Sequence, residues 1–165
     1  TGGGLYRYAL RDRVVVNGHY GDAPSLEFVG KADNVVDHRG EKLSEAFVAS
    51  CMSETFDELG VEPGCAMLAP DLSTEPPGYM LYIESLRTLP DTLRDRLEEK
   101  LSRGYHYALC IRLGQLQPLR VMRIRAPAFD AYAQALVARG MRLGDIKPTP
   151  LSRYADWSVR FEAFS

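Results

Sequence analysis

The sequence has 165 residues, of which 45% are hydrophobic and 25% charged, a composition typical of one globular domain with its own core. The formal net charge is -2, which argues against a dedicated nucleic-acid-binding protein because such proteins usually carry a basic excess. No apolar run approaches the roughly 20 residues that span a bilayer, and three scattered cysteines are typical of reduced thiols in a cytoplasmic protein.

The chain begins with the residues Thr1-Gly2-Gly3-Gly4 and has no initiator methionine. The next residues, 5–8, already have the composition of a strand, and a natural protein seldom starts at the edge of one. This beginning predicts a fragment, or a processed C-terminal piece, of a longer protein. The alternative is the remnant of a tag followed by a complete domain.

Two extended runs, residues 5–16 and 26–29, predict a β-hairpin near the start of the chain. The residues between them, 17–24, are rich in turn formers and predict a wide loop. A short third strand is expected at residues 35–36, and a turn follows at residues 38–41.

An amphipathic helix is expected after Ser44, which is a typical N-cap, with Glu45 favourably placed against the helix dipole. Gly60 stands where a C-cap glycine belongs. Between these ends an apolar stripe recurs at helical spacing, formed by Val48, Met52, Phe56 and Leu59. Two apolar runs of strand length, residues 65–68 and 79–83, follow on either side of a loop.

The next helix is predicted by leucines that repeat every four residues, namely Leu89, Leu93, Leu97 and Leu101. A capping box is expected to start it at Thr88, and Gly104 interrupts it. A second helical stretch continues through Tyr105, Leu109 and Leu113. Residues 119–124 predict a strand, and a further helix is expected from Pro127 to Gly140. The tail has the alternation of a strand, formed by Trp157, Val159, Phe161 and Phe164.

From Val35 onward the predicted order is β-α-β-β-α-β followed by another helix. This is the order of a split βαβ, or ferredoxin-like, fold. The sequence therefore predicts an α+β protein in which a β-hairpin precedes a ferredoxin-like small domain.

Three features stand out as chemical candidates. Asp12 lies between two arginines in an extended run, and the neighbouring guanidinium groups favour its ionised form. Residues 30–34 form a polar break between two strands, which can absorb a backbone rotation as a hinge. Lys147 lies on a proline-stiffened segment, from which it could reach into a cleft. For each feature the alternative is an ordinary surface salt bridge, turn or solvated lysine.

Other clusters favour ordinary structure. His106 and Cys110 lie four residues apart on a predicted helix, but no second pair accompanies them, so packing is expected and no metal ligand is predicted. A basic group alternates with apolar residues, which is typical of the solvated side of an edge strand; it comprises Arg120, Arg123 and Arg125. The sequence contains no Walker-type phosphate-binding motif.

Several segments, in this order, resemble the adenylate-forming superfamily of acyl-CoA synthetases, luciferases and acyl acid amido synthetases. Residues 5–14 (LYRYALRDRV) are similar to its tyrosine-arginine…glycine-aspartate segment, and residues 28–36 (FVGKADNVV) to its glycine-arginine-x-aspartate hinge. Residues 39–45 and 107–116 resemble the Gretchen Hagen auxin-responsive branch, particularly its bacterial members. Residues 144–148 (GDIKP) resemble the terminal lysine loop of that branch.

The resemblance implies the C-terminal domain of an ATP-dependent acyl-acid ligase. Residues 1–30 would be a hairpin that ends a missing large N-terminal domain, residues 31–34 a hinge, and residues 35–165 a small mobile domain. The parent enzyme would adenylate a small carboxylic acid and transfer the acyl group to an amine or amino acid. ATP and Mg²⁺ are implied, bound mostly by the missing domain, so this chain alone is expected to be inactive. Neither nucleic acid nor a membrane is an expected partner.

Carried over by position, the resemblance assigns roles to four residues. Asp12 would accept hydrogen bonds from the ribose hydroxyls, and Lys31 would approach the ribose or the phosphate. Asp33 would be the hinge residue. Lys147 would bridge the acyl carboxylate and the α-phosphate and stabilise the charge that develops there during adenylation.

Two positions depart from the superfamily pattern. The glycine that precedes the aspartate is replaced by Arg11, and the linker arginine is replaced by Lys31, which cannot make a bidentate contact. These departures favour the alternative function, a non-catalytic ferredoxin-like binding or regulatory module.

Overall fold

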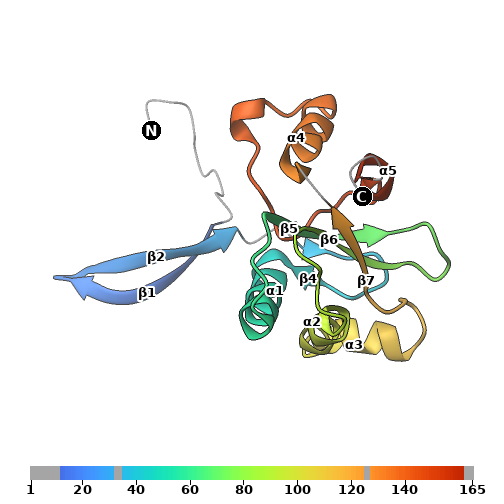
Figure 1. The fold of residues 1–165 in the computed structure, drawn as a ribbon. Coiled ribbons are helices and arrows are strands. Elements are labelled where there is room, and N and C mark those ends of the chain that lie inside the picture. The colour runs from blue at the N-terminus through green and yellow to red at the C-terminus, as the bar shows by residue number, and fades with distance from the viewer. Residues whose placement is uncertain (1–11, 32–34, 125–126, 162–165) are drawn as a thin grey trace. The chain divides into compact units, whose positions relative to one another are not determined.

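The structure is a computed structural model that describes residues 12–31, 35–124 and 127–161 (Figure 1). The chain divides into two compact units, Thr1–Asn34 and Val35–Ser165. The first unit contains a β-hairpin, and the second contains a three-stranded sheet with helices on both faces.

The hairpin pairs β1 (Asp12–Tyr20) with β2 (Ala23–Lys31) in antiparallel register. The predicted wide loop is wrong, because only Gly21 and Asp22 connect the two strands. Gly21 has a φ of +58°, and a positive φ is what a tight two-residue turn requires. The turn formers at Asn17 and Gly18 instead mark a register shift in the ladder, after Val16, where a bulge absorbs the extra residue. The part of the predicted first strand before Asp12 lies outside the described residues.

The sheet of the second unit has the order β5-β6-β7. The strand β5 (Cys65–Asp71) pairs antiparallel with β6 (Gly78–Glu84), which pairs parallel with β7 (Arg120–Ile124). These strands confirm the three predicted apolar runs. A short antiparallel ribbon of β3 (Val35–Val36) and β4 (Leu43–Ser44) precedes the first helix.

Helices cover both faces of this sheet (Figure 1). One face packs against α1 (Glu45–Leu59), α2 (Leu93–Leu101) and α3 (Tyr105–Arg112). The other face packs against α4 (Ala128–Ala138) and α5 (Trp157–Phe161).

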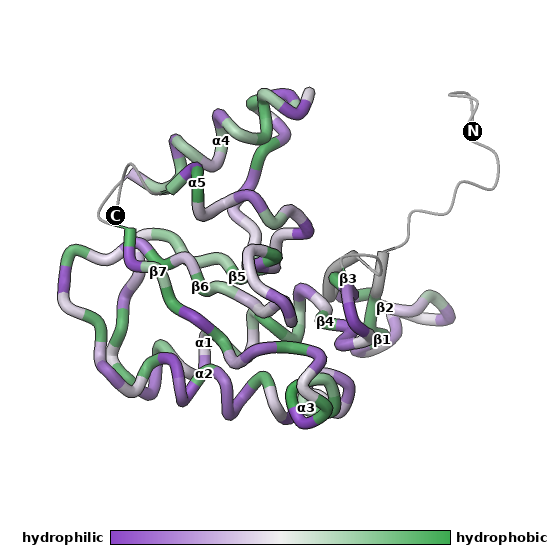
Figure 2. The backbone as a smooth tube through the Cα atoms, turned by 90° about the vertical axis from the view of Figure 1, so that its right-hand side faces the viewer, coloured by the Kyte–Doolittle hydropathy of each residue, from purple (hydrophilic) through white to green (hydrophobic). Residues whose placement is uncertain are grey.

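Strand residues alternate between the two layers, as the period of a strand requires. Leu81 and Ile83 enter the first core cluster, whereas Met80 and Tyr82 enter the second. Along α2 and α4, hydrophilic and hydrophobic residues are interspersed (Figure 2), as expected for helices with one buried face.

The α+β class is confirmed, but the strand order differs from the ferredoxin-like one that was expected. In a split βαβ, another strand separates the two parallel strands that a helix connects. Here β6 and β7 are direct neighbours, joined by the crossover that contains α2 and α3. The short strand β3 pairs with β4 in a ribbon of its own, because two residues offer too few ladder hydrogen bonds to form a central strand.

The helix ends of α1 follow the predicted signals. The Ser44 hydroxyl accepts a hydrogen bond from the amide of Phe47 at 3.3 Å, and Gly60 adopts the left-handed conformation with a φ of +61°. By contrast, α2 begins at Leu93 and not after Thr88, so the predicted capping box is wrong. The helix is preceded by Thr92, whose side chain makes no capping hydrogen bond.

In the second half, the helical stretch that begins at Tyr105 is confirmed, whereas the predicted strand of the tail is wrong. In α3 the buried residues are Tyr107 and Cys110, whereas Tyr105 is 70% exposed. The tail forms the helix α5 and not a strand, because Trp157 and Phe161 lie four residues apart and both are buried in the second cluster. Phe164 lies outside the described residues.

Candidate functional site

Lys147 lies on a loop that follows the short 3-10 helix η1 (Leu143–Asp145). Ile146 before it is buried, with 7% of its surface exposed, whereas Lys147 itself is exposed. After the loop, Leu151 forms a parallel bridge to Leu68 of β5. The loop therefore leaves the second core cluster, presents Lys147 to solvent, and returns to the edge of the sheet.

Backbone hydrogen bonds fasten the end of this loop to β5. The amide of Leu68 donates to the carbonyl of Pro150 at 2.8 Å, and the amide of Ser152 donates to the carbonyl of Leu68 at 2.9 Å. The Ser152 hydroxyl also accepts a hydrogen bond from Nε1 of the buried Trp157 at 2.8 Å. The segment that carries Lys147 is therefore held as part of the fold.

Two contacts hold the loop at Lys147 and just after it. The Tyr132 hydroxyl, from α4, donates to the carbonyl oxygen of Lys147 at 3.2 Å. The Thr149 hydroxyl lies 3.0 Å from Oε1 of Glu45, at the start of α1. Below the loop lies a small apolar pocket, lined by Cys65, Met67, Tyr82, Ile124, Ala128, Tyr132, Pro148, Thr149 and Phe161.

The two predicted nucleotide-binding residues lie opposite each other in the hairpin. Asp12 at the start of β1 and Lys31 at the end of β2 are register partners, and facing residues of an antiparallel pair have their Cα atoms about 4.5–5.5 Å apart. The backbone register therefore pairs these two positions at the open end of the hairpin. The predicted hinge residue Asp33 lies outside the described residues.

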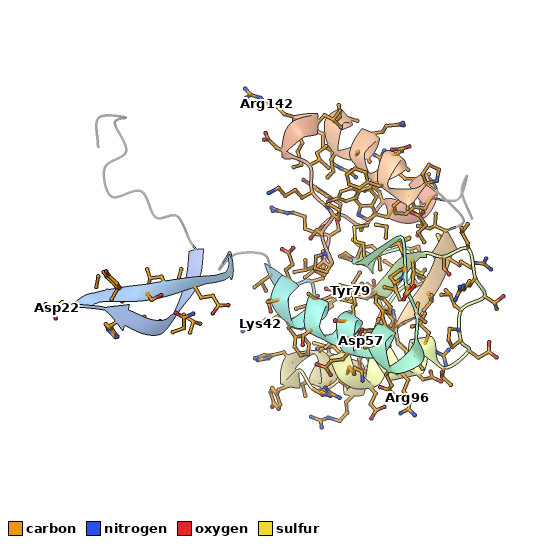
Figure 3. All side chains as sticks on the ribbon, turned by 60° about the vertical axis from the view of Figure 1, so that its left-hand side comes forward. Asp22, Lys42, Asp57, Tyr79, Arg96 and Arg142 are labelled. Atoms are coloured by element: carbon orange, nitrogen blue, oxygen red, sulfur yellow. The ribbon has the colours of Figure 1, made fainter. Side chains whose placement is uncertain are left out.

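Sequence reasoning missed a buried carboxylate at Glu41, which is 2% exposed. It accepts hydrogen bonds from the backbone amides of His38 at 2.9 Å and Arg39 at 2.7 Å, and from the hydroxyl of Tyr79. Burial alone would raise the pKa of Glu41, but these hydrogen bonds hold that pKa below its usual value. Figure 3 shows Tyr79 inside the second unit and Lys42 at its surface.

A half-buried glutamate, Glu98, joins α2 to the segment before β7. Its Oε2 accepts a hydrogen bond from the amide of Leu119 at 2.6 Å and another from the Tyr107 hydroxyl at 3.2 Å. Burial raises the pKa of Glu98 and outweighs these contacts. Glu41 and Glu98 each fasten one element to another, and this role accounts for their contacts. Only a three-dimensional structure reveals them, because each pairs with a tyrosine on a different element.

The remaining candidates lie in different surroundings. Cys110 is buried, whereas His106 is exposed, and within the described ranges no three His, Cys, Asp or Glu side chains gather as a metal site. On β7, Arg120 pairs with the buried Asp71. Arg123 donates to the carbonyls of Ser85 and Leu86, at 3.0 and 3.1 Å, and Arg125 lies outside the described residues.

All three cysteines are free thiols, namely Cys51, Cys65 and Cys110. None of the helices in the described ranges combines the length and the hydropathy that a membrane span needs.

Comparison with protein families gives two matches. The C-terminal domain of the GH3 family matches residues 45–156, and the central domain of the GH3 family matches residues 1–31. The two matches are separated by residues 32–44, which include the boundary between the compact units.

Curated relatives extend this likeness along most of the chain. A probable indole-3-acetic acid-amido synthetase, GH3.7, from Oryza sativa subsp. japonica is 28% identical over 92% of this chain. The 4-substituted benzoates-glutamate ligase GH3.12 from Arabidopsis thaliana is 25% identical over 87% of it. A GH3 domain-containing protein from Homo sapiens is 26% identical over 81% of it. The chain spans only 27%, 28% and 27% of the lengths of these relatives.

Solved structures show the same fold. The GH3.15 acyl acid amido synthetase superposes with a TM-score of 0.79 at 20% identity, covering 98% of this chain and 31% of that one. The AtGH3.15 acyl acid amido synthetase in complex with 2,4-DB gives a TM-score of 0.78 at 22% identity over the same shares. The expectation of a bacterial branch stays a prediction. Since the C-terminal domain match alone covers most of the sequence, the chain belongs to the GH3 family.

Proposed function

We propose that this chain is the C-terminal part of an ATP-dependent acyl acid amido synthetase of the cytoplasm. Such an enzyme adenylates a carboxylic acid and then transfers the acyl group to an amine, forming an amide. The observation that carries the proposal is the exposed Lys147 on a loop that is fastened to the fold, inside the region that matches the GH3 C-terminal domain.

Lys147 would act during adenylation. When the carboxylate attacks the α-phosphorus of ATP, negative charge grows on the phosphate oxygens, and an ammonium group held nearby stabilises that charge. An exposed lysine on an anchored loop is suited to this role. When the small domain docks on the large domain, only the lysine side chain has to become ordered, because the loop backbone is already fixed. Loss of one such electrostatic group typically costs about 10²–10³ in rate.

Asp12 and Lys31 would contribute to the nucleotide site. The backbone register pairs the two positions, which supports a joint role, because a carboxylate acceptor and a cation suit the ribose and the phosphate of ATP. The phosphate-binding loop, the acyl pocket and the ligands of Mg²⁺ would lie on a large N-terminal domain. This chain spans only 27% of the length of GH3.7 and 31% of that of GH3.15, which supports such a partner domain.

Asp33 would be the hinge about which the small domain turns between the two half-reactions. The division of the chain into compact units after Asn34 supports this placement. Residues 1–30 would then remain with the large domain, and residues 35–165 would move.

Product formation by the full-length protein tests the proposal. With ATP, Mg²⁺, a panel of carboxylic acids and the common amino acids, we expect AMP, pyrophosphate and an amide identified by mass spectrometry. The chain of 165 residues alone serves as the control, and it should catalyse no ATP–pyrophosphate exchange. Robust exchange by the chain alone would refute the division of labour, and a full-length protein that forms no amide with any acid would refute the activity.

A further inference from the structure

The loop that carries Lys147 is held from two layers of the fold at once. Tyr132 belongs to α4, which covers one face of the sheet, whereas Glu45 begins α1, which covers the other. Both contacts reach the loop where it passes the edge of β5, beside the bridge from Leu151 to Leu68. The loop is therefore held from two layers, at the carbonyl of Lys147 and at Thr149.

The contact from α1 joins Thr149 to Glu45 across 104 positions of sequence, at 3.0 Å. The same hydroxyl lies 3.0 Å from the carbonyl of Leu151 and accepts a hydrogen bond from the Leu151 amide at 3.4 Å. Glu45 follows the N-cap Ser44, so its carboxylate stands on the first turn of a 15-residue helix. A hydroxyl that donates to a carboxylate makes a charge-assisted hydrogen bond, which is stronger than a neutral one.

The contact from α4 is equally well supported. Tyr132 is only 6% exposed, and its ring stacks on that of Trp157, with centroids 5.2 Å apart and an interplanar angle of 26°. Packing of this kind leaves the ring little freedom, so the hydroxyl that donates to the Lys147 carbonyl has a fixed position. Pro148 and Pro150 on either side of Thr149 limit the backbone further, because the proline ring fixes φ.

We propose that Thr149, Glu45 and Tyr132 are positioning residues, which hold the backbone around Lys147 so that its ammonium group enters the adenylation site from one direction. The proposal rests on the proposed role of Lys147. A lysine side chain has four rotatable bonds, so a backbone that also moved would spread the ammonium over a large volume and lower the fraction of productive encounters.

The test uses the full-length protein and two readouts. The first is hydrogen–deuterium exchange of the amides in residues 146–152, which reports on the loop without any substrate. In Thr149→Val and Glu45→Ala we expect this exchange to accelerate about tenfold, because each substitution removes the hydrogen bond between the Thr149 hydroxyl and the Glu45 carboxylate. Ser50→Ala is the matched control, because it removes a hydroxyl–carboxylate contact of 3.1 Å to Glu54 on the same helix and should leave the loop unchanged.

The second readout is the kinetics of adenylate formation. Thr149→Val should lower kcat about tenfold, with the KM values for ATP and acid nearly unchanged, and Thr149→Ser should restore it because the serine hydroxyl can make the same contact. A double variant of Thr149 and Glu45 should be no slower than Thr149→Val alone, since Thr149→Val already removes the contact between the two side chains. A merely stabilising contact would lower the melting temperature and leave kcat intact.

The outcomes separate this inference from the proposed function. Unchanged loop exchange in Thr149→Val overturns the inference, and so does accelerated exchange with an unchanged kcat while Lys147→Ala remains slow. If Lys147→Ala adenylates at the normal rate, the role of Lys147 fails and the positioning role fails with it, although the exchange data still report whether the contact holds the loop.

Discussion

Removing the hydroxyl of Tyr79 isolates the contribution of the buried Glu41–Tyr79 pair. Tyr79 is 1% exposed, and Tyr79→Phe keeps the ring and its packing at a centroid distance of 6.3 Å from Tyr107. Glu41 keeps its two amide donors, so the carboxylate is not left without partners. The cost is therefore that of one hydrogen bond to a charged group, about 2 kcal/mol, or about a 30-fold change in the folding equilibrium constant.

Chemical denaturation of the chain, followed by tryptophan fluorescence, measures this cost at pH 7 and at an acidic pH below the folded pKa of Glu41. The pKa of Glu41 is lower in the folded state, so its stabilising contribution is complete above the unfolded value of about 4.3 and is lost as the pH falls through the folded pKa. At the acidic pH we expect the cost of Tyr79→Phe to fall to about 1 kcal/mol, the value of a neutral hydrogen bond.

Tyr105→Phe is the control, because Tyr105 is 70% exposed and its hydroxyl should contribute almost nothing. A cost for Tyr79→Phe below about 0.5 kcal/mol at pH 7 would show that the hydroxyl contributes no net hydrogen bond. A cost that stays equal at both pH values would show that the charge of Glu41 plays no part.

Three further predictions concern the second unit. Leu97→Ala should destabilise the chain by about 2–5 kcal/mol, because Leu97 is fully buried in the first core cluster; a loss below about 1 kcal/mol in urea denaturation would contradict this packing. Gly60→Ala should cost about 1–2 kcal/mol, since the φ of +61° is strained for alanine although nothing lies within 4 Å of the new Cβ, and an unchanged midpoint would argue against the left-handed cap. Burial raises the pKa of Cys51 to about 11, so this thiol should resist Ellman's reagent at pH 8 until the chain unfolds, and rapid modification in the native state would refute its burial.

Helix α1 shows what the sequence could predict and why. Its N-cap at Ser44, its buried residues Val48, Met52 and Phe56, and its C-cap at Gly60 all lie where the pattern placed them. Each of these signals is local, because a cap involves residues three or four positions apart and a stripe repeats every turn. These local signals all indicate the same helix, so they were sufficient to predict its position from the sequence.

The errors arose where two local interpretations compete. Asn17 and Gly18 are turn formers, but the ladder accommodates them at a register shift, and the turn itself moves to Gly21. Trp157 and Phe161 fit both a strand with period two and a helix with spacing four, and the aromatic packing against α4 selects the helix. In each case a contact with another element decides which of the two local structures forms. Such a contact is not encoded in the local sequence.

The candidate site divides in the same way. Lys147 was singled out by its proline-stiffened segment and then by a resemblance of motifs, and its role stays a prediction. The register pairing of Asp12 with Lys31 follows from the hairpin itself. The contact between Thr149 and Glu45 joins residues that are 104 positions apart in the sequence, so no rule based on local spacing could predict it.

The rate of adenylate formation by the full-length protein carrying Lys147→Ala tests the central claim most directly. ATP–pyrophosphate exchange should fall about 10²–10³-fold, while Lys42→Ala, which removes a lysine exposed on the same unit, should exchange at the normal rate. Exchange by Lys147→Ala at the rate of the unaltered protein would contradict the claim that this lysine stabilises the reacting phosphate.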